Sequence, residues 1–442
     1  MPKKNNPAPV TIIGGGLAGT EATYQLVRRG IPVKLFEMRP RVETGAHQTD
    51  LLGELVCSNS LGSNLPDRAS GLLKEELRAF GSYILDTAYK YRVPAGNALA
   101  VDRDAFAREI TRYVKGHSMV EFVNEEATDI PEEGLVIVAS GPLTSKRLLD
   151  HLVKRFGQKS LSFFDAIAPI VEAESIDMTR AYRGDRYSLE PKGDYINCPM
   201  TREEYETFVD ALLKAKKIDL PAFEKEAKKK FFSACQPVEQ IAASGREALR
   251  FGPLKPVGLV DPVSKHRSYA VLQLRQDNLL SSLYNLVGCQ TNLVHGEQER
   301  VFRLIPALRN AKFVRLGQMH RNSYLYSPKF LTTTLQVKDH PNWFLAGQIT
   351  GVEGYTESTG TGLLAGLNAA RITLGKTLVD PPPATMLGAL LRYITFPGHK
   401  QFTPMNANFG LFGDDKAETA DDRRAAIITE ARRAFRAYFQ EL

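Results

Sequence analysis

A glycine-rich turn near the start of the chain has the residue types and spacing of a dinucleotide-binding site. The turn consists of Gly14, Gly15, Gly16, Leu17, Ala18 and Gly19, and it fits the pattern GxGxxG. In this pattern one glycine allows a tight turn, a second lets the backbone approach a pyrophosphate, and a third permits close helix packing. Glu37 follows about twenty residues later, where a carboxylate can accept the ribose hydroxyls. We therefore expect NAD or FAD to bind here, because the acidic residue argues against NADP.

A second glycine-rich segment, residues 346–366, favours FAD over NAD. It has the pattern of a strand, a glycine loop that contains Gly347, and the start of an apolar helix that contains Gly360 and Gly362. The N-terminus of such a helix can stabilise negative charge on a reduced flavin. Because the chain has only one complete GxGxxG pattern, we do not expect a built-in domain for a pyridine nucleotide.

The elements around the first turn have the layout of a βαβ unit. Residues 10–13 and 33–36 are apolar and predict strands, with a helical pattern between them that ends at Gly30. Two later apolar segments that end in glycine, 135–141 and 343–347, predict further strands of the same sheet. The expected fold is α/β. A Rossmann-type FAD-binding domain, residues 1–175 and 300–442, is interrupted by an α+β insertion domain, residues 176–299, and has a helical C-terminus from about residue 381.

The composition excludes several classes of protein. Of the 442 residues, 43% are hydrophobic and 24% are charged, and no run approaches the roughly 18 apolar residues that a membrane span requires. The N-terminus lacks the apolar stretch of a secretory signal, so we expect a cytoplasmic protein without membrane contact. The four cysteines form no CxxC pair, which indicates neither a metal site nor a dithiol redox motif. The net charge of +7 favours a polyanionic partner.

Several further segments, taken in their order and spacing, point to one enzyme family. They are residues 55–60, 235–239, 296–303 and 319–322, together with the glycine loop at 347–366. These segments resemble the folate- and FAD-dependent tRNA (uracil-5-)-methyltransferases, and the resemblance extends from Val10 to about Asn408. It implies that methylenetetrahydrofolate donates a one-carbon unit to reduced FAD, which passes it to a uridine of the tRNA T-loop. NADH or NADPH would reduce the flavin, which supplies the hydride that completes the methyl group.

The resemblance implies roles for two cysteines. Carbon 5 of uracil is a poor nucleophile until a group adds at carbon 6, and a thiolate is well suited to that reversible addition. By the resemblance, Cys235 would attack the uracil ring, and Cys57 would lie beside the flavin and handle the methylene group or a proton. The division of labour between them stays open, and either thiol could instead be a small buried hydrophobe. Cys198 and Cys289 lack matching flanks, so we expect them to be structural.

The resemblance also implies binding residues for the folate. His320 would lie near the pterin, on which its flat ring could stack. Arg321 and Glu353 would hold the pterin or the glutamate tail. The alternatives are a histidine in the core or on the surface and two solvated charges.

A basic segment just before Cys235 is a candidate contact for tRNA. It contains Lys228, Lys229 and Lys230. Such lysines could contact the RNA backbone, because phosphate contacts fix the register of a nucleic acid. They could equally form a solvated helix face beside neighbouring glutamates. The expected partners are tRNA and folate, and no obligatory protein partner is evident.

Two other functions fit the same residues. One is a small-molecule FAD-dependent oxidoreductase, in which the insertion shapes a substrate pocket and the basic charge is incidental. The other is a tRNA-binding flavoprotein that acts mainly as an RNA-folding factor.

Overall fold

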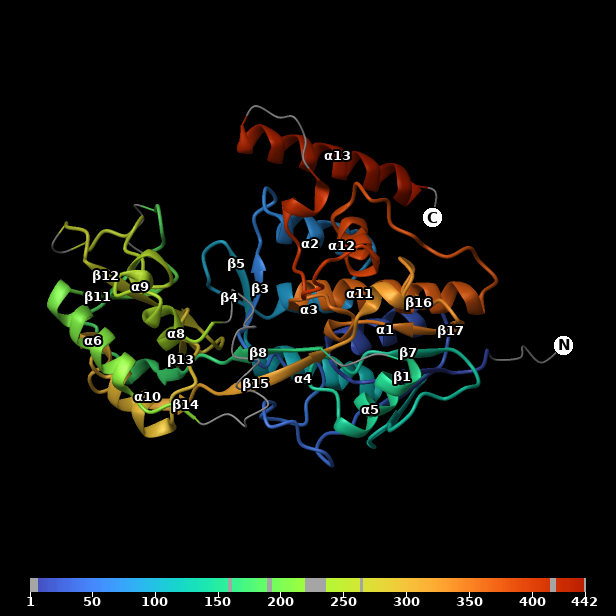
Figure 1. Cartoon of the computed structure of the whole chain (residues 1–442), viewed down its shortest axis with the longest axis horizontal. Helices are drawn as coiled ribbons and strands as arrows, with labels where there is room; N and C mark the ends of the chain where they lie inside the picture. The colour runs from blue at the N-terminus through green and yellow to red at the C-terminus, as the bar shows by residue number, and fades with distance from the viewer. Residues whose placement is uncertain are drawn as a thin grey trace.

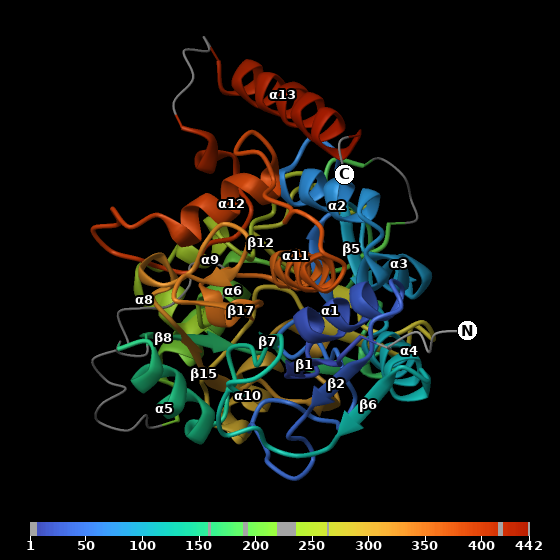
Figure 2. The ribbon, with the colours of Figure 1, turned by 90° about the vertical axis from the view of Figure 1, so that its right-hand side faces the viewer.

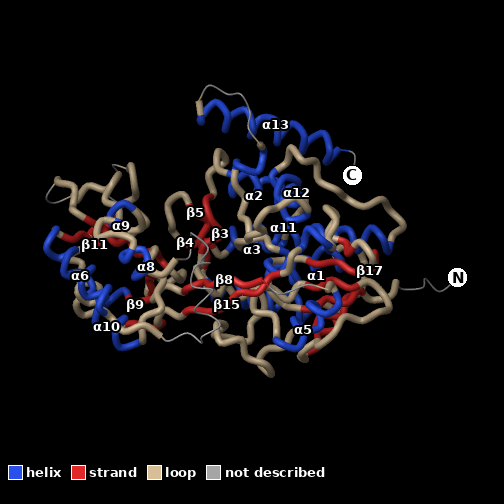
Figure 3. Tube along the Cα trace, in the orientation of Figure 1, coloured by secondary structure: helices blue, strands red, loops and turns tan. Residues whose placement is uncertain are grey.

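The protein is described by a computed structural model that covers residues 7–157, 161–188, 193–218, 236–262, 265–413 and 419–440. Figure 1 shows two bodies, one around each of two six-stranded sheets, with a pair of strands running between them. Figure 3 shows the strands of these sheets as separate groups. In the described part of the chain, no helix combines the length and apolar character needed to cross a membrane.

The first sheet is the Rossmann-type sheet that the sequence predicts. Its strand order is β16-β17-β7-β1-β2-β6. The strands are β1 (Val10–Ile13), β2 (Val33–Phe36), β6 (Val120–Val123), β7 (Val136–Val138), β16 (Gln336–Val337) and β17 (His340–Leu345). β1 pairs in parallel with β2 on one side and β7 on the other, and the chain reaches β7 only after β2 and β6, so the strand order reverses at β1. In parallel α/β sheets the carboxyl ends of the strands beside such a point form a ligand-binding crevice.

Two helices pack against each other over this sheet. They are α1 (Leu17–Val27) and α11 (Tyr355–Thr373), which lie side by side in Figures 1 and 2. An added Cβ at Gly366 of α11 would come within 2.7 Å of the Ala22 backbone of α1. Small residues thus allow the two helix backbones to approach closely, and both helices are buried along most of their length.

The remaining elements of the first body surround this pair. They are the helices α2 (Ala69–Ala79), α3 (Tyr83–Lys90), α4 (Arg103–Gly116), α5 (Lys146–Arg155), α12 (Met386–Thr395) and α13 (Ala420–Gln440) and the strands β3 (Ser60–Ser63), β4 (Arg92–Val93) and β5 (Ala98–Val101). The predicted helical C-terminus is confirmed: α13 lies along the outside of the first body, where Phe435 and Phe439 contact Phe80.

In the second sheet, every pair of neighbouring strands is antiparallel. Its order is β10-β11-β12-β13-β9-β14. The strands are β9 (Ile170–Glu172), β10 (Tyr182–Arg183), β11 (Ile196–Met200), β12 (Ala270–Gln276), β13 (Leu283–Leu286) and β14 (Phe313–Arg315), with helices α6 (Arg202–Lys214), α8 (Val238–Ala243), α9 (Ala248–Phe251) and α10 (His295–Phe302). Because β9 and β14 belong to this sheet, it extends beyond the boundaries at 175/176 and 299/300 expected from the sequence.

A two-stranded ribbon joins the two bodies. It consists of β8 (Leu161–Ala166) and β15 (Met319–Tyr324), which pair antiparallel and lie between the sheets in Figure 1. Short 3-10 turns complete the structure at Ala173–Ser175, Pro306–Leu308, Ser327–Lys329, Gln348–Thr350 and Phe409–Phe412. The ribbon matters for function because its strands form one wall of the cleft described next.

Candidate active site

An open cleft lies at the carboxyl ends of the first-sheet strands. The cleft and the solvent at its open mouth together occupy about 1090 Å³. Its walls come from the glycine turn between β1 and α1, the ends of β2 and β7, the start of α11, and the ribbon. These elements are far apart in the sequence, and the switch in connection direction at β1 brings them together.

The glycine turn leaves room where a dinucleotide phosphate would lie. A Cβ at Gly14, which has a φ of +108°, would lie 2.5 Å from the Ala139 carbonyl oxygen. At Gly16 no atom lies within 4 Å of the Cβ position, and this residue lines the cleft. A Cβ at Gly19 would overlap the Gly14 oxygen at 1.9 Å, so Gly19 serves the close packing of α1. Open space in front of a helix N-terminus suits an anionic phosphate.

The acidic residue at the end of β2 is held by its neighbours. The Gly15 N–H donates to Glu37 Oε2 at 2.9 Å, and Arg39 Nε donates to Glu37 Oε1 at 3.0 Å. Both residues are buried in the cleft wall. Oε1 also accepts from the Arg39 backbone N–H at 3.0 Å, so Oε2 is the oxygen with acceptor capacity left for a ribose hydroxyl of a dinucleotide.

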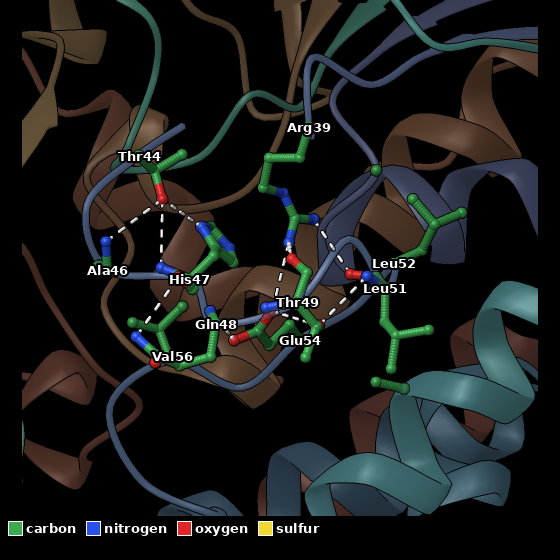
Figure 4. Close-up of polar contacts among 12 residues, drawn as sticks. Arg39, Thr44, Ala46, His47, Gln48, Thr49, Leu51, Leu52, Glu54 and Val56 are labelled. Atoms are coloured by element: carbon green, nitrogen blue, oxygen red, sulfur yellow. Dashed lines mark hydrogen bonds and ion pairs between the residues drawn. The ribbon is translucent and has the colours of Figure 1, made fainter. Parts of the chain in front are cut away.

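Arg39 also organises the loop that follows. Its Nη1 donates to the Thr49 carbonyl at 3.1 Å and approaches Glu54 Oε2 at 3.4 Å, while Nη2 donates to the Leu51 carbonyl at 3.1 Å. The Thr49 hydroxyl donates to Glu54 at 2.7 Å. Figure 4 shows the loop folded around this one guanidinium. The loop leads directly to Cys57, so Arg39 connects the ribose end of the site with the thiol.

His47 lies in the same loop and lines the cleft. Its Nδ1 lies 2.7 Å from the Thr44 hydroxyl (Figure 4). Burial lowers the pKa of His47 to about 3, and the charges of Arg39 and His320 act in the same direction. The imidazole is therefore neutral near pH 7.

Helix α11 begins at the cleft. Its first residue, Tyr355, and Ser358 both line the cleft, as does Gly347 in the preceding turn. Neither Gly360 nor Gly362 lines it: a Cβ at Gly360 would meet Leu77 and Leu387, and one at Gly362 would lie 2.2 Å from the Ala18 carbonyl oxygen. These two glycines serve packing, and they act on a cofactor only by fixing where the N-terminus of α11 lies.

The Cys57 thiol is half-buried and lines the cleft. Its Sγ lies 3.5 Å from the Ala166 carbonyl oxygen and 3.9 Å from Asp165 Oδ1, and both oxygens are acceptors. The Cys57 N–H donates to the Tyr355 hydroxyl at 2.8 Å, and burial raises the pKa of that phenol. The thiol thus lies between the start of α11 and the ribbon.

The ribbon brings polar groups to the opposite wall. His320 pairs in register with Asp165, and both residues line the cleft together with Asn322. Within the described residues, His320 Nδ1 and Asn322 Oδ1 are buried without a hydrogen-bond partner. Burial lowers the pKa of His320, so its ring is neutral near pH 7. A buried polar atom without a partner is costly, which favours a ligand that supplies one.

The other predicted folate contacts lie at the margin. Arg321 is exposed and lines a groove beside the cleft together with Lys146 and Arg147. Glu353 is buried behind Gln348, a cleft residue whose side-chain amide donates to the Glu353 carboxylate. Burial raises the pKa of Glu353 well above its ordinary range, and the charge of Asp165 adds to this.

Some predicted residues lie outside the described part of the chain. These are Cys235, Lys228, Lys229 and Lys230. Cys198 and Cys289 are buried in the second body, and burial raises the pKa of Cys289 to about 12, so both suit a structural role. Among the described residues, no group of histidine, cysteine and acidic side chains could hold a metal ion.

The sequence analysis missed several residues of the cleft. His47, Asp165, Asn322 and Tyr355 all line it, and none of them was predicted as a site residue. The best available signal was proximity in the sequence, because Asn322 and Tyr355 lie within segments that were quoted for the family resemblance. Asp165 and Cys57 are 108 residues apart, and their 3.9 Å approach comes from the fold, which sequence spacing does not reveal.

The sheet, the open glycine turn, the acidic residue on β2 and the helix that starts at the cleft define a Rossmann-type dinucleotide-binding protein of the flavoprotein class. A family model described as Glucose inhibited division protein A matches residues 9–377. Among solved structures, Aquifex aeolicus GidA has a similar fold, with a TM-score of 0.68 at 17% identity over 98% of this chain and 74% of that one.

Sequence relatives make the assignment more specific. The methylenetetrahydrofolate–tRNA-(uracil-5-)-methyltransferase TrmFO of Brevibacillus brevis is 51% identical over 416 residues, which are 94% of each chain. That of Moorella thermoacetica is 54% identical over 402 residues, or 91% of each chain. The chain belongs to the Glucose inhibited division protein A family and, within it, to the TrmFO methyltransferases. The family expected from the sequence is confirmed.

Proposed function

We propose that this protein methylates carbon 5 of a uridine in the tRNA T-loop, taking the carbon from methylenetetrahydrofolate, with FAD bound in the cleft. The observation that carries the proposal is that a thiol, Cys57, lines the same cleft as the dinucleotide-binding turn. The relatives are named for this reaction. An oxidoreductase acting on small molecules would need neither that thiol nor a basic chain.

The residues of the cleft fit FAD. The turn at Gly14 to Gly16 and the N-terminus of α1 would hold the pyrophosphate, and Glu37 would accept the ribose hydroxyls. The N-terminus of α11 would lie at the flavin ring. When bound, FAD would supply one-carbon transfer and hydride chemistry, with NADH or NADPH as the reductant.

The chain itself would bind and orient the folate and handle protons. His320 and Asn322 would contact the pterin, since each has a buried polar atom without a partner in the described residues. Glu353 would orient the side-chain amide of Gln348 toward the pterin, and Arg321 would contact the glutamate tail from the adjoining groove. Cys57 would hold a proton or contact the one-carbon unit.

Contacts to the RNA complete the proposal. Cys235 would add to carbon 6 of the uracil, and Lys228, Lys229 and Lys230 would contact the tRNA backbone. We place the reaction in the cytoplasm, where a reducing environment keeps cysteines as thiols. A role in RNA folding would be a second activity and would persist in a Cys235→Ala variant that no longer methylates.

Labelled one-carbon transfer tests the proposed function. Purified protein is incubated with unmethylated tRNA, NADPH and methylenetetrahydrofolate labelled in its methylene carbon. The tRNA is then digested to nucleosides, which are analysed by mass spectrometry. We expect label in 5-methyluridine, with none when S-adenosylmethionine is the labelled donor. A tRNA whose target uridine is replaced by cytidine serves as the control. Protein that is folded and loaded with FAD but transfers no label would refute the proposal.

A further inference from the structure

The segment that carries Cys57 is tied to the second sheet through buried polar side chains. Asn59 is fully buried, and its Nδ2 donates to the Gln276 carbonyl at 2.9 Å and to the Val101 carbonyl at 3.0 Å. Its Oδ1 accepts from Arg275 Nε at 3.0 Å and from Asn285 Nδ2 at 3.2 Å. Three of these four partners lie on β12 and β13, so the second sheet determines where Asn59 lies.

An ion pair across the two bodies holds the other side of the thiol. Arg103, at the start of α4, donates through Nε and Nη2 to Asp277 Oδ1 at 3.2 and 3.1 Å. The two side chains are only 10% and 6% exposed. The same guanidinium donates through Nη1 to the carbonyls of Leu55 and Val56, at 3.0 and 3.4 Å. Asp277 directly follows β12, so a carboxylate of the second body orients an arginine that holds the backbone before Cys57.

The Arg103 guanidinium depends on this carboxylate. A buried charge is tolerated when it is paired, and loss of one partner leaves the other uncompensated. Without Asp277, Arg103 would lose the acceptor that fixes its plane, and Leu55 and Val56 would lose a donor held in one orientation. Asn285 reinforces the arrangement, because its Nδ2 lies 3.1 Å from Asp277 Oδ1 and 3.2 Å from Asn59 Oδ1.

We propose that Asp277 is a positioning residue for Cys57: through Arg103 on one side and Asn285 and Asn59 on the other, the second sheet sets where the thiol lies in the cleft. The proposal rests on the proposed function, in which Cys57 takes part in methyl transfer. It assigns the second body a role in the flavin-side chemistry in addition to any contact with RNA.

Two variants separate positioning from general stability. Asp277→Ala removes the acceptor, while Arg103→Lys keeps the positive charge but cannot bridge the carboxylate and both carbonyls. For each we expect kcat to fall about 10-fold to 100-fold, the effect of a small misplacement of a reacting group. FAD content and the KM for tRNA should stay at wild-type values. Iodoacetamide should alkylate Cys57, identified by its peptide mass, faster than in wild type.

Conservative and matched changes provide the controls. Asp277→Asn keeps an oxygen acceptor at the same place but not the negative charge, so it should recover part of the kcat that Asp277→Ala loses. Arg250→Lys changes an arginine of the second body that likewise contacts a carbonyl, of Tyr269, and a carboxylate, of Glu247, without reaching the thiol. It should leave both kcat and Cys57 alkylation at wild-type values.

Wild-type alkylation and kcat in Asp277→Ala and Arg103→Lys would overturn the proposal. So would a fall in kcat that only follows the loss of folded, FAD-loaded protein. If the Asp277→Ala variant does not fold, the kcat and alkylation rate of Arg103→Lys alone test the proposal. Failure of the proposed function is distinct: wild-type protein would then transfer no labelled carbon to tRNA, while alkylation would still report whether Asp277 positions the thiol.

Discussion

Single residues in the cleft are matched to neutral, hydrogen-bonding roles. His47 and His320 both have lowered pKa values because they are buried, and Glu353 has a raised pKa for the same reason. Both imidazoles are therefore uncharged near pH 7, beside a thiol that donates to oxygen acceptors. Neutral, hydrogen-bonding imidazoles suit contact with a flat heteroaromatic ligand such as a pterin.

His47 makes the stability of the protein depend on pH. In the folded protein the pKa of His47 is about 3, below the ordinary value of 6.5. Below pH 6.5, therefore, the imidazole binds a proton in the unfolded chain but not in the folded chain. Stability is therefore lost as the pH falls from 6.5 toward 3, by about 1 kcal/mol per pH unit. Between pH 7.5 and pH 5.5, the urea midpoint of unfolding should fall further for wild type than for His47→Gln.

The exposed His295 provides the control for this measurement. His295→Gln should keep the wild-type pH dependence. An equal loss of stability on acidification in His47→Gln and wild type would show that His47 is not held neutral by its surroundings.

At the scale of elements, the contact between α1 and α11 aligns both helix N-termini with the cleft. Gly362 and Gly366 of α11 lie against the α1 backbone at Ala18 and Ala22, so any side chain there would push the helices apart. Since α1 begins at the glycine turn and α11 begins at Tyr355, this packing sets the spacing between the pyrophosphate end and the flavin end of the site.

Gly362→Ala tests this packing. The added Cβ would lie 2.2 Å from the Ala18 carbonyl oxygen and 2.5 Å from its Cα, which are backbone atoms and cannot move aside cheaply. We expect a loss of about 1–3 kcal/mol of stability and weaker FAD retention. The thermal midpoint and the ratio of FAD to protein after gel filtration measure both effects.

Gly116→Ala is the matched control. Gly116 is the last residue of α4, and a Cβ there would meet no atom within 4 Å. The free energy of unfolding of this variant should change by no more than about 1 kcal/mol, and any change should be stabilising. The packing role of Gly362 would be refuted if the two variants matched each other in stability and FAD content.

Local patterns in the sequence predicted the first sheet and the glycine turn well, because GxGxxG, its flanking strands and Glu37 lie within one short βαβ unit. Contacts between distant segments could not be read this way. Arg103 and Asp277 are 174 residues apart, and only the fold brings them together.

Gly360 and Gly362 matched a glycine-rich motif, yet nothing in the motif separates packing glycines from those that line a cleft. The strands β9 and β14 are three residues each, too short to locate an insertion boundary.

At the scale of the whole molecule, the ribbon of β8 and β15 places the second body beside the cleft of the first. The cleft wall thereby combines the glycine turn of one body with Asp165 and His320 of the ribbon. The Cys57 segment lies close by, and Asp277 of the second body holds it through Arg103. The account therefore centres on one thiol, placed beside a dinucleotide site by both bodies.

The most direct test of that claim is the 5-methyluridine content of T-loops in tRNA from cells that lack this protein, with the wild-type or the Cys57→Ala gene restored. Mass spectrometry should find the nucleoside missing without the protein, restored by wild type, and still missing with Cys57→Ala, although that variant purifies with FAD. Normal 5-methyluridine in cells without the protein, or full restoration by Cys57→Ala, would contradict the account.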